Sequence, residues 1–90
     1  MKLILCRRCQ DIVKALPEWR SCSCGKSKAR YIDDLHAEYM GPCIPIGLDN
    51  NSMLLAIRVR PKTGLGSGFK AFVIPEVCKT FTRIANGRIT

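Results

Sequence analysis

Four of the six cysteines occur in two closely spaced pairs, a spacing suited to binding a metal ion. Cys6 and Cys9 form a C-x2-C pair, and Cys22 and Cys24, followed by Gly25, form a C-x-C-G pair. Each pair can offer two thiolates from one tight turn, and zinc in structural sites takes four such ligands in a tetrahedron. Glycine can adopt a positive φ, which lets the turn direct backbone N–H groups toward sulfur. The pattern predicts one structural zinc ion with no open position for water.

Disulfide bonds and redox chemistry are the alternatives to zinc. Two disulfides, or one disulfide with free thiols, would also account for paired cysteines, and C-x-x-C is also a redox motif. No βαβ pattern surrounds Cys6 and Cys9, as a thioredoxin-like site requires. The segment Met1–Cys6 is far too short for the apolar region of a secretory signal, so we expect a cytoplasmic protein with reduced thiols. This compartment favours zinc.

The two remaining cysteines, Cys43 and Cys78, lie outside both pairs. We expect each to act as a small buried hydrophobic residue. The alternative is an exchange of Cys43 into the metal shell.

The segments around the cysteine pairs must bring the pairs together. Ile12–Leu16 and Trp19–Ser21 have strand character, and Pro17-Glu18 supplies a turn between them. Such a hairpin would return the second pair to the first and make residues 1–31 a zinc ribbon. Arg30–Met40 is expected to continue the ribbon sheet as a longer strand.

A short helix is expected after residue 49. Asp49–Ser52 is rich in helix-capping residues, and Met53–Ala56 contains mostly good helix formers. Residues 55–60 also alternate between apolar and other residues, which is strand periodicity. We favour the helix, ending near Pro61.

The other segments of the second half read as extended pieces and loops. Ile44–Leu48 is a short extended piece, and its proline, Pro45, predicts a place near a sheet edge. Thr63–Gly68 is a glycine-rich loop, and Phe69–Ile74 is a strand. The chain beyond Ile84 is expected to be loosely ordered.

The predicted fold class is α+β, mostly β, with an N-terminal zinc ribbon that continues into a small sheet with one short helix. Ninety residues suit a single domain, 1–90, and domains this small often need a metal or another staple. Within it we expect a zinc-ribbon part at 1–31, a small α+β part at 32–84 and a loosely ordered tail at 85–90.

Charge is distributed unevenly along the chain, whose formal net charge is +8. Residues 1–30 contain eight Lys/Arg against two acids, and residues 31–52 contain four acids and no Lys/Arg. Residues 53–90 contain seven Lys/Arg against one acid. Four thiolates and a zinc ion would lower the total to about +6. The chain is basic enough for anionic partners, and its two-signed surface also suits docking to a protein.

Two groups of basic residues are candidates for partner or nucleic-acid binding, although such residues also serve simply as solvated charges. Trp19 and Phe69 could stack on bases, but we expect both in the core. The second group surrounds the glycine-rich loop and consists of Arg58, Arg60, Lys62 and Lys70. The first group, around the cysteine pairs, consists of Arg7, Arg8, Arg20, Lys26, Lys28 and Arg30.

No set of residues suggests catalysis. His36 stands among acids with no nucleophile to pair with it. Asp33 and Asp34 are adjacent, so on a strand they would point to opposite faces. The run Gly64-x-Gly66-x-Gly68 lacks the following helix and the lysine-serine ending of a phosphate-binding loop. We therefore expect a binding protein rather than an enzyme.

Several stretches resemble a group of small zinc-ribbon proteins of bacteriophages and prophages, a group of unestablished activity. The resemblance spans most of the chain and implies a structural zinc and an origin in a mobile element. It rests on Cys6-Arg7-Arg8-Cys9, Trp19-Arg20-Ser21-Cys22-Ser23-Cys24-Gly25, Arg30-Tyr31-Ile32-Asp33-Asp34, Pro45-Ile46-Gly47-Leu48, Asn51-Ser52 and Ala71-Phe72-Val73-Ile74-Pro75.

The functional expectation is a zinc-stabilised, non-catalytic binding module in the cytoplasm of a bacterial host. It would be a phage-type accessory protein that modulates a host macromolecule, such as transcription or defence machinery, by protein contact. Direct nucleic-acid binding through a basic face is the alternative. No apolar run approaches the roughly 20 residues that span a bilayer, so no membrane partner is expected.

Overall fold

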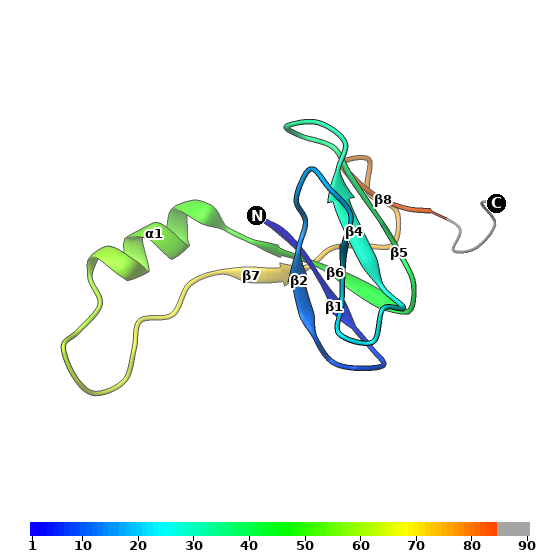
Figure 1. Cartoon of the computed structure of the whole chain (residues 1–90). Coiled ribbons are helices and arrows are strands. Elements are labelled where there is room, and N and C mark those ends of the chain that lie inside the picture. The colour runs from blue at the N-terminus through cyan, green and yellow to red at the C-terminus, as the bar shows by residue number, and fades with distance from the viewer. Residues whose placement is uncertain (85–90) are drawn as a thin grey trace.

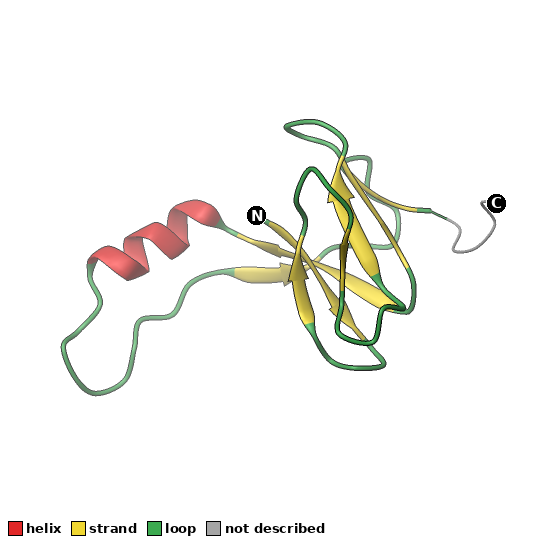
Figure 2. Cartoon of the chain, in the orientation of Figure 1, coloured by secondary structure: helices red, strands yellow, loops and turns green. Residues whose placement is uncertain are grey.

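The computed structural model describes residues 1–84, which form two four-stranded sheets and one helix. Figures 1 and 2 show a body of strands from which α1 and the loop after it project to one side. The mostly-β fold with one short helix is confirmed among these residues. The predicted tail, 85–90, lies outside the described residues. The elements are β1 (Lys2–Cys6), β2 (Ile12–Lys14), β3 (Arg20–Ser21), β4 (Lys28–Tyr31), β5 (Ala37–Met40), β6 (Cys43–Leu48), α1 (Asn50–Arg58), β7 (Ala71–Val73) and β8 (Phe81–Arg83).

The first sheet has the order β2-β1-β6-β7, and all its neighbouring strands are antiparallel. The expected hairpin between the strands at Ile12–Leu16 and Trp19–Ser21 is wrong. β2 pairs with β1, and β3 pairs with β4 in the other sheet. Each cysteine pair therefore sits in the turn of its own hairpin. Alternation identifies a strand but not its ladder partner, and β1 had not been recognised as a strand.

The second sheet has the order β3-β4-β5-β8. The single long strand expected over Arg30–Met40 is wrong, because a turn at residues 32–36 splits it into β4 and β5. The carboxylate of Asp33 accepts hydrogen bonds from the backbone N–H groups of Leu35 (2.8 Å) and His36 (2.7 Å), which closes the turn. Aspartate commonly stabilises turns in this way. β8, which was not predicted, adds to β5 in parallel.

Pro45 lies in an inner strand rather than near an edge, since β6 runs between β1 and β7. The Pro45 carbonyl accepts a hydrogen bond from Ile74 N (3.0 Å), just beyond the end of β7. The N and C=O of a strand residue point to the same side, so the missing N–H of Pro45 also faces the end of β7. The ladder with β1 loses no donor there, which makes an inner proline tolerable.

The core draws on both sheets. Neither of the two aromatic residues that we expected in the core, Trp19 and Phe69, is buried there. Phe81 and Tyr39 lie in the core with ring centroids 4.9 Å apart at 71°, an edge-to-face pair. Trp19 is only half-buried, and Phe69 is 45% exposed on the projecting loop. Strands of residues 1–31 pair with strands of residues 32–84 in both sheets, through β1–β6 and β4–β5.

The helix favoured for residues 53–60 is present as α1, one turn earlier than expected, and the strand expected over Phe69–Ile74 is present as the shorter β7. None of the described helices is long and apolar enough to cross a membrane. Residues 59–70 form the loop that returns from α1 to β7. The described chain extends over 50 × 27 × 22 Å, and the long dimension includes this projection (Figure 1).

Candidate metal centre

The first cysteine pair occupies the turn between β1 and β2. Cys6 is the last residue of β1 and is fully buried. Its backbone N–H donates to Asp11 O (2.9 Å), and its carbonyl accepts from Gln10 N (2.8 Å). Gln10 has a φ of 61°, so the chain turns back sharply after Cys9. This tight turn places two thiols at one end of the hairpin.

The second pair occupies the turn between β3 and β4 and has the same construction. Gly25 has a φ of 78°, as the C-x-C-G pattern predicted, and its N–H donates to Cys22 O (3.0 Å). Cys22 N donates to Ser27 O (2.9 Å). Ser27 N in turn donates to Cys22 Sγ (3.4 Å), which is the N–H to sulfur contact expected of a metal-binding turn.

Asp11 connects the two turns, a role that no sequence signal indicated. One oxygen of its carboxylate accepts hydrogen bonds from Ser23 N (2.9 Å) and Ser23 Oγ (3.0 Å). Ser23 stands between the two cysteines of the second pair. The contact therefore fixes one cysteine pair against the other from outside the thiol group.

The four predicted ligands lie together: all four Sγ atoms are within 4.8 Å of one another. Cys24 Sγ lies 3.7 Å from Cys6 Sγ and 3.5 Å from Cys22 Sγ. A zinc ion with sulfur at about 2.3 Å requires sulfur–sulfur edges of about 3.8 Å in a tetrahedron. A disulfide requires about 2.05 Å. The arrangement fits four thiolates around one metal ion.

The thiols perturb one another in the way expected of such a cluster. The Ser27 hydroxyl and then the Cys9 N–H favour the thiolate of Cys6 and lower its pKa to about 6. At Cys24, the Lys26 N–H favours the thiolate, but burial and the other thiols outweigh it and raise the pKa to about 11. Burial opposes ionisation of Cys22, yet the Ser27 N–H and the Cys24 thiol prevail and lower its pKa. A divalent cation would remove this conflict, because it stabilises all four thiolates together.

Ser27 is a second residue that sequence reasoning missed. It is fully buried, and its Oγ has no hydrogen-bond partner of good geometry within residues 1–84. The hydroxyl lies beside the thiols of Cys6 and Cys43. A metal-bound Cys6 thiolate offers that hydroxyl an acceptor, as outer-shell donors to metal ligands commonly have.

Cys43 and Cys78 do not belong to the four-thiol group. Cys43 lies opposite Cys6 in the β1–β6 ladder and is buried, and burial raises its pKa. Its Sγ contacts Met40 O at 3.5 Å. Cys78 is half-buried against the core, with Sγ 3.5 Å from Thr80 Oγ1, a contact that lowers its pKa. Cys43 is thus buried, as predicted, whereas Cys78 is only partly buried.

The basic residues around the cysteine pairs divide into two sets. Arg30 Nε forms an ion pair with Glu38 (2.7 Å), and its guanidinium lies 4.7 Å from the Trp19 ring centre. Lys28 lies 6.0 Å from the same ring. These two contact other parts of the chain and are half-buried. The remaining candidates are exposed: Arg7, Arg8, Arg20 and Lys26.

Three of the exposed cations, Arg7, Arg8 and Lys26, lie at the thiol end of the body. Arg7 and Arg8 follow Cys6 directly, and Lys26 follows Cys24 by two residues, so the short Cys6–Cys24 sulfur distance places them near one another. Three positive side chains thus flank the thiol group, and a zinc ion bound by four thiolates would add a charge of about −2 beside them. This end is a surface that an anionic group can approach.

Comparisons with known proteins give no further assignment of this centre. No family model, no curated protein and no solved structure matches the chain. The interpretation of the centre therefore rests on the chemistry and geometry of the chain's own residues, and these describe a compact group of four thiols that can bind a metal ion.

Proposed function

We propose that Cys6, Cys9, Cys22 and Cys24 bind one structural zinc ion and that the protein is a zinc-stabilised, non-catalytic binding module of the zinc-ribbon type. The observation that carries this proposal is the set of four Sγ atoms within 4.8 Å of one another, at the ends of two hairpins. Four thiolates in a tetrahedron select zinc or iron over harder cations. We propose zinc because a closed shell of four cysteines is a common structural zinc site.

The proposed role of the metal is structural. Four protein thiolates fill a tetrahedral shell, so no position remains for a substrate or a reactive water. Zinc at such sites contributes directly to folding, with binding free energies on the order of 10 kcal/mol. The body has a small core, and the metal would join its two sheets because each sheet supplies one cysteine pair.

Binding to another macromolecule by protein contact is the proposed activity. We propose the role of a phage-type accessory protein that modulates host transcription or defence machinery, since the sequence resemblance implies an origin in a mobile element. Support comes from the two-signed surface, with exposed cations at the thiol end and exposed carboxylates at the β4–β5 turn. Such surfaces orient a protein partner and set its specificity.

The metal proposal is tested by elemental analysis of protein purified without added metal. We expect one zinc per chain, and we expect Cys22→Ser to reduce that content sharply. Cys78→Ser is the matched control and should keep one zinc. Iron in place of zinc, with its visible thiolate absorbance, or disulfide-bonded cysteines in the purified protein would contradict the assignment.

The partner proposal is tested by capture of host proteins with the zinc-loaded protein. A variant with charges reversed at Arg7, Arg8 and Lys26 is the control for the thiol-end surface. We expect one or a few host proteins to be retained by the native chain and lost with this variant. Equal retention by both would show that the thiol end is not the contact surface.

Direct nucleic-acid binding is the second candidate, and the exposed cations at the thiol end are the observation that favours it. A protein that neutralises several phosphates loses about 0.9 log units of affinity per log unit of salt for each duplex contact. We expect only weak DNA or RNA binding that fades near physiological salt. A sequence-selective complex tighter than about micromolar at that salt would promote this candidate above protein contact.

A further inference from the structure

Helix α1 and the loop after it, residues 50–70, form an arm that projects from the body of strands (Figure 1). The base of the arm is well held. Asp49 N donates to Lys70 O (3.0 Å), and Lys70 N donates to Ser52 Oγ (2.9 Å). Beyond this base, the loop has no regular structure. The arm is thus fixed at its root, and within residues 1–84 no hydrogen bond joins residues 53–69 to the strands.

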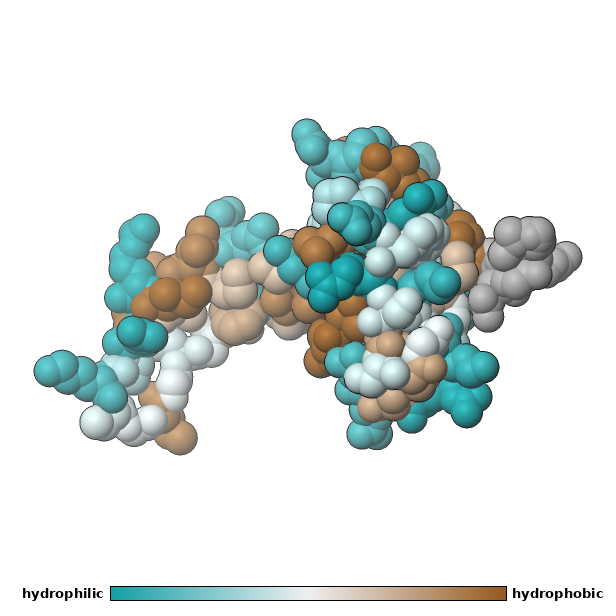
Figure 3. All heavy atoms as spheres, viewed as in Figure 1, coloured by the Kyte–Doolittle hydropathy of each residue, from teal (hydrophilic) through white to brown (hydrophobic). Residues whose placement is uncertain are grey.

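The arm exposes far more apolar surface than it buries. In α1, Ala56 is the one buried residue. Figure 3 shows hydrophobic side chains on the visible face of the helix. A nine-residue helix is too short to be stable by its own hydrogen bonds, and helices in proteins depend on packing of an apolar face. The large apolar residues left at least 45% exposed on the arm are Leu54, Leu55, Ile57, Val59, Leu65 and Phe69. An apolar surface of this extent usually marks a contact site.

The charge of the arm is of one sign. It carries Arg58, Arg60, Lys62 and Lys70, and no Asp or Glu occurs from residue 50 to residue 75. The surface that covers the arm must therefore combine apolar groups with negative charge.

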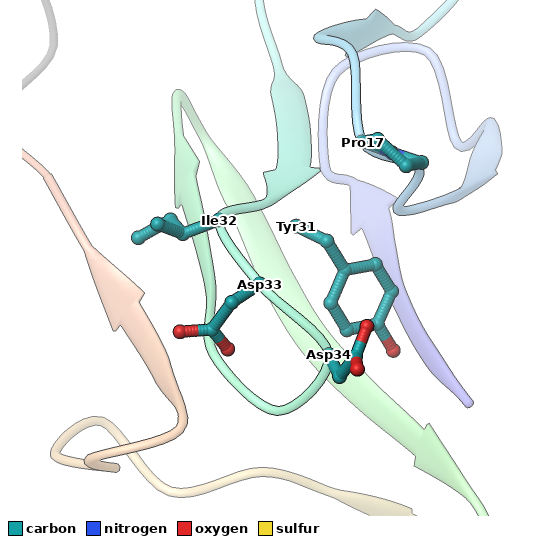
Figure 4. A pocket seen from close by; sticks show the side chains of 5 residues that line it. All are labelled: Pro17, Tyr31, Ile32, Asp33 and Asp34. Atoms are coloured by element: carbon teal, nitrogen blue, oxygen red, sulfur yellow. The ribbon is translucent and has the colours of Figure 1, made fainter.

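The body of the same chain has a surface with that combination, at the β4–β5 turn. Asp33 and Asp34 are exposed there, beside Ile32 (60% exposed) and Leu35 (57% exposed), and Lys2 Nζ donates to Leu35 O (2.8 Å), so the corner keeps one net negative charge. A shallow pocket of about 380 Å³ adjoins the turn. Figure 4 shows its lining, in which the Asp34 carboxylate overlaps the ring of Tyr31 and the Asp33 carboxylate points away from it; the lining residues are Pro17, Tyr31, Ile32, Asp33 and Asp34. We refer to this turn and pocket as the acidic corner.

From these two surfaces we infer that the protein forms a two-fold dimer in which the arm of each copy docks on the acidic corner of the other. Within one copy the arm points away from the body, so it does not cover its own corner (Figure 1). A second copy supplies the corner, and a two-fold axis makes the exchange mutual, which covers both arms and leaves no open end. The inference stands apart from the proposed function, because neither the metal site nor the thiol-end cations take part.

The test exchanges the charges of the two surfaces. Arg58→Glu, Arg60→Glu and Lys62→Glu together take the arm from +4 to −2, and Asp34→Lys, beside Lys2, makes the corner basic. Asp34 is chosen because the carboxylate of Asp33 closes the β4–β5 turn. All four positions are exposed, so we expect the variants to fold.

Sedimentation of the zinc-loaded native chain over a range of concentrations should show a monomer–dimer equilibrium that weakens with salt. In each variant taken alone, the arm and the corner carry charge of the same sign, so like charges face each other at both contacts of its dimer. The dissociation constant of that dimer should rise tenfold or more. In a one-to-one mixture of the two variants, the acidic arm can meet the basic corner and the native arm can meet the native corner. Unlike charges then face each other at both contacts, and a heterodimer of native strength should form.

A matched control carries the same charge change at the thiol end, through Arg7→Glu, Arg8→Glu and Lys26→Glu. This control should dimerise like the native chain. The inference is overturned if the native chain stays monomeric at millimolar concentration, or if it grows into longer oligomers. It is also overturned if the mixture of variants fails to restore the dimer. Zinc content measured on the same samples separates these results from a failure of the metal proposal.

Discussion

Gly41, in the turn between β5 and β6, lies against the backbone of Lys26 and Ser27, just after the second cysteine pair. Its φ is +102°, and a Cβ added there would lie 2.1 Å from Lys26 O and 2.7 Å from Ser27 Cα. Both atoms are backbone atoms, so no side-chain rotation can relieve the contact. Ser27 also donates its N–H to Cys22 Sγ, so movement of this backbone disturbs a metal ligand. Gly41→Ala is therefore expected to damage the fold and the metal site together.

The size of the effect follows from two costs. A left-handed φ costs a residue with a Cβ about 1–2 kcal/mol. Forcing an extra carbon into packed surroundings costs about 1–3 kcal/mol more. Gly41→Ala should therefore lower the free energy of unfolding by about 2–5 kcal/mol. Disturbance of groups that orient metal ligands typically lowers metal affinity by about 10–100-fold, and we expect a loss in that range.

Gly64 provides the matched control. Its φ is +85°, but a Cβ added there meets no atom within 4 Å. Gly64→Ala should lower the free energy of unfolding by only about 1–2 kcal/mol, the cost of the φ angle alone. Its zinc affinity should be native, because Gly64 lies in the arm.

Equilibrium urea unfolding at saturating zinc measures the first quantity, and competition with a chromophoric chelator measures the second. If Gly41→Ala and Gly64→Ala agree within 0.5 kcal/mol and have equal zinc affinity, the contact between this turn and the metal site is unimportant and the reasoning fails.

Three further results are expected. Phe81→Ala should lower the free energy of unfolding by about 3–5 kcal/mol, because Phe81 is fully buried; Leu65→Ala, at a side chain 93% exposed, should change it by less than about 0.5 kcal/mol. Similar losses for both would contradict the described core. The N–H groups of His36 and Leu35 hold the pKa of Asp33 at about 2, below its usual 3.8. The stability contributed by the Asp33 carboxylate is thus complete above pH 3.8 and is lost as the pH falls through 2. A midpoint near 3.8 in an NMR titration of this carboxyl would refute this. Replacement of Cys43 and Cys78 together by alanine should leave one zinc per chain with a modest loss of stability, whereas loss of the metal would place one of them in the shell.

Local sequence signals predicted the features that depend on few neighbouring residues. The spacing of the cysteine pairs and Gly25 predicted two tight turns, and the structure brings their four thiols together. The capping residues before Met53 predicted α1, because helix formation depends on contacts three and four residues apart. The zinc ion itself, the absence of catalysis and the nature of the partner remain predictions.

Strand pairing was predicted poorly, because a two-residue period shows that a segment is extended and not which segment lies beside it. The hairpin expected across Pro17-Glu18 instead places its two halves in different sheets. Pro45 was assigned to an edge by its missing N–H, yet it lies in an inner strand because that side faces the end of β7. Likewise, Asp11 and Ser27 carry no motif that marks them as supports of the thiol group.

The sequence by itself thus determined the candidate ligands and the mostly-β character of the chain, and it favoured the helix over a strand, because each follows from residue types and short spacings. Only the tertiary structure decided that each sheet contributes one cysteine pair, that β8 closes the second sheet beside β5, and that α1 stands away from the body. These features depend on contacts between residues far apart in the chain, such as Ala37 with Phe81, and local patterns do not specify such contacts.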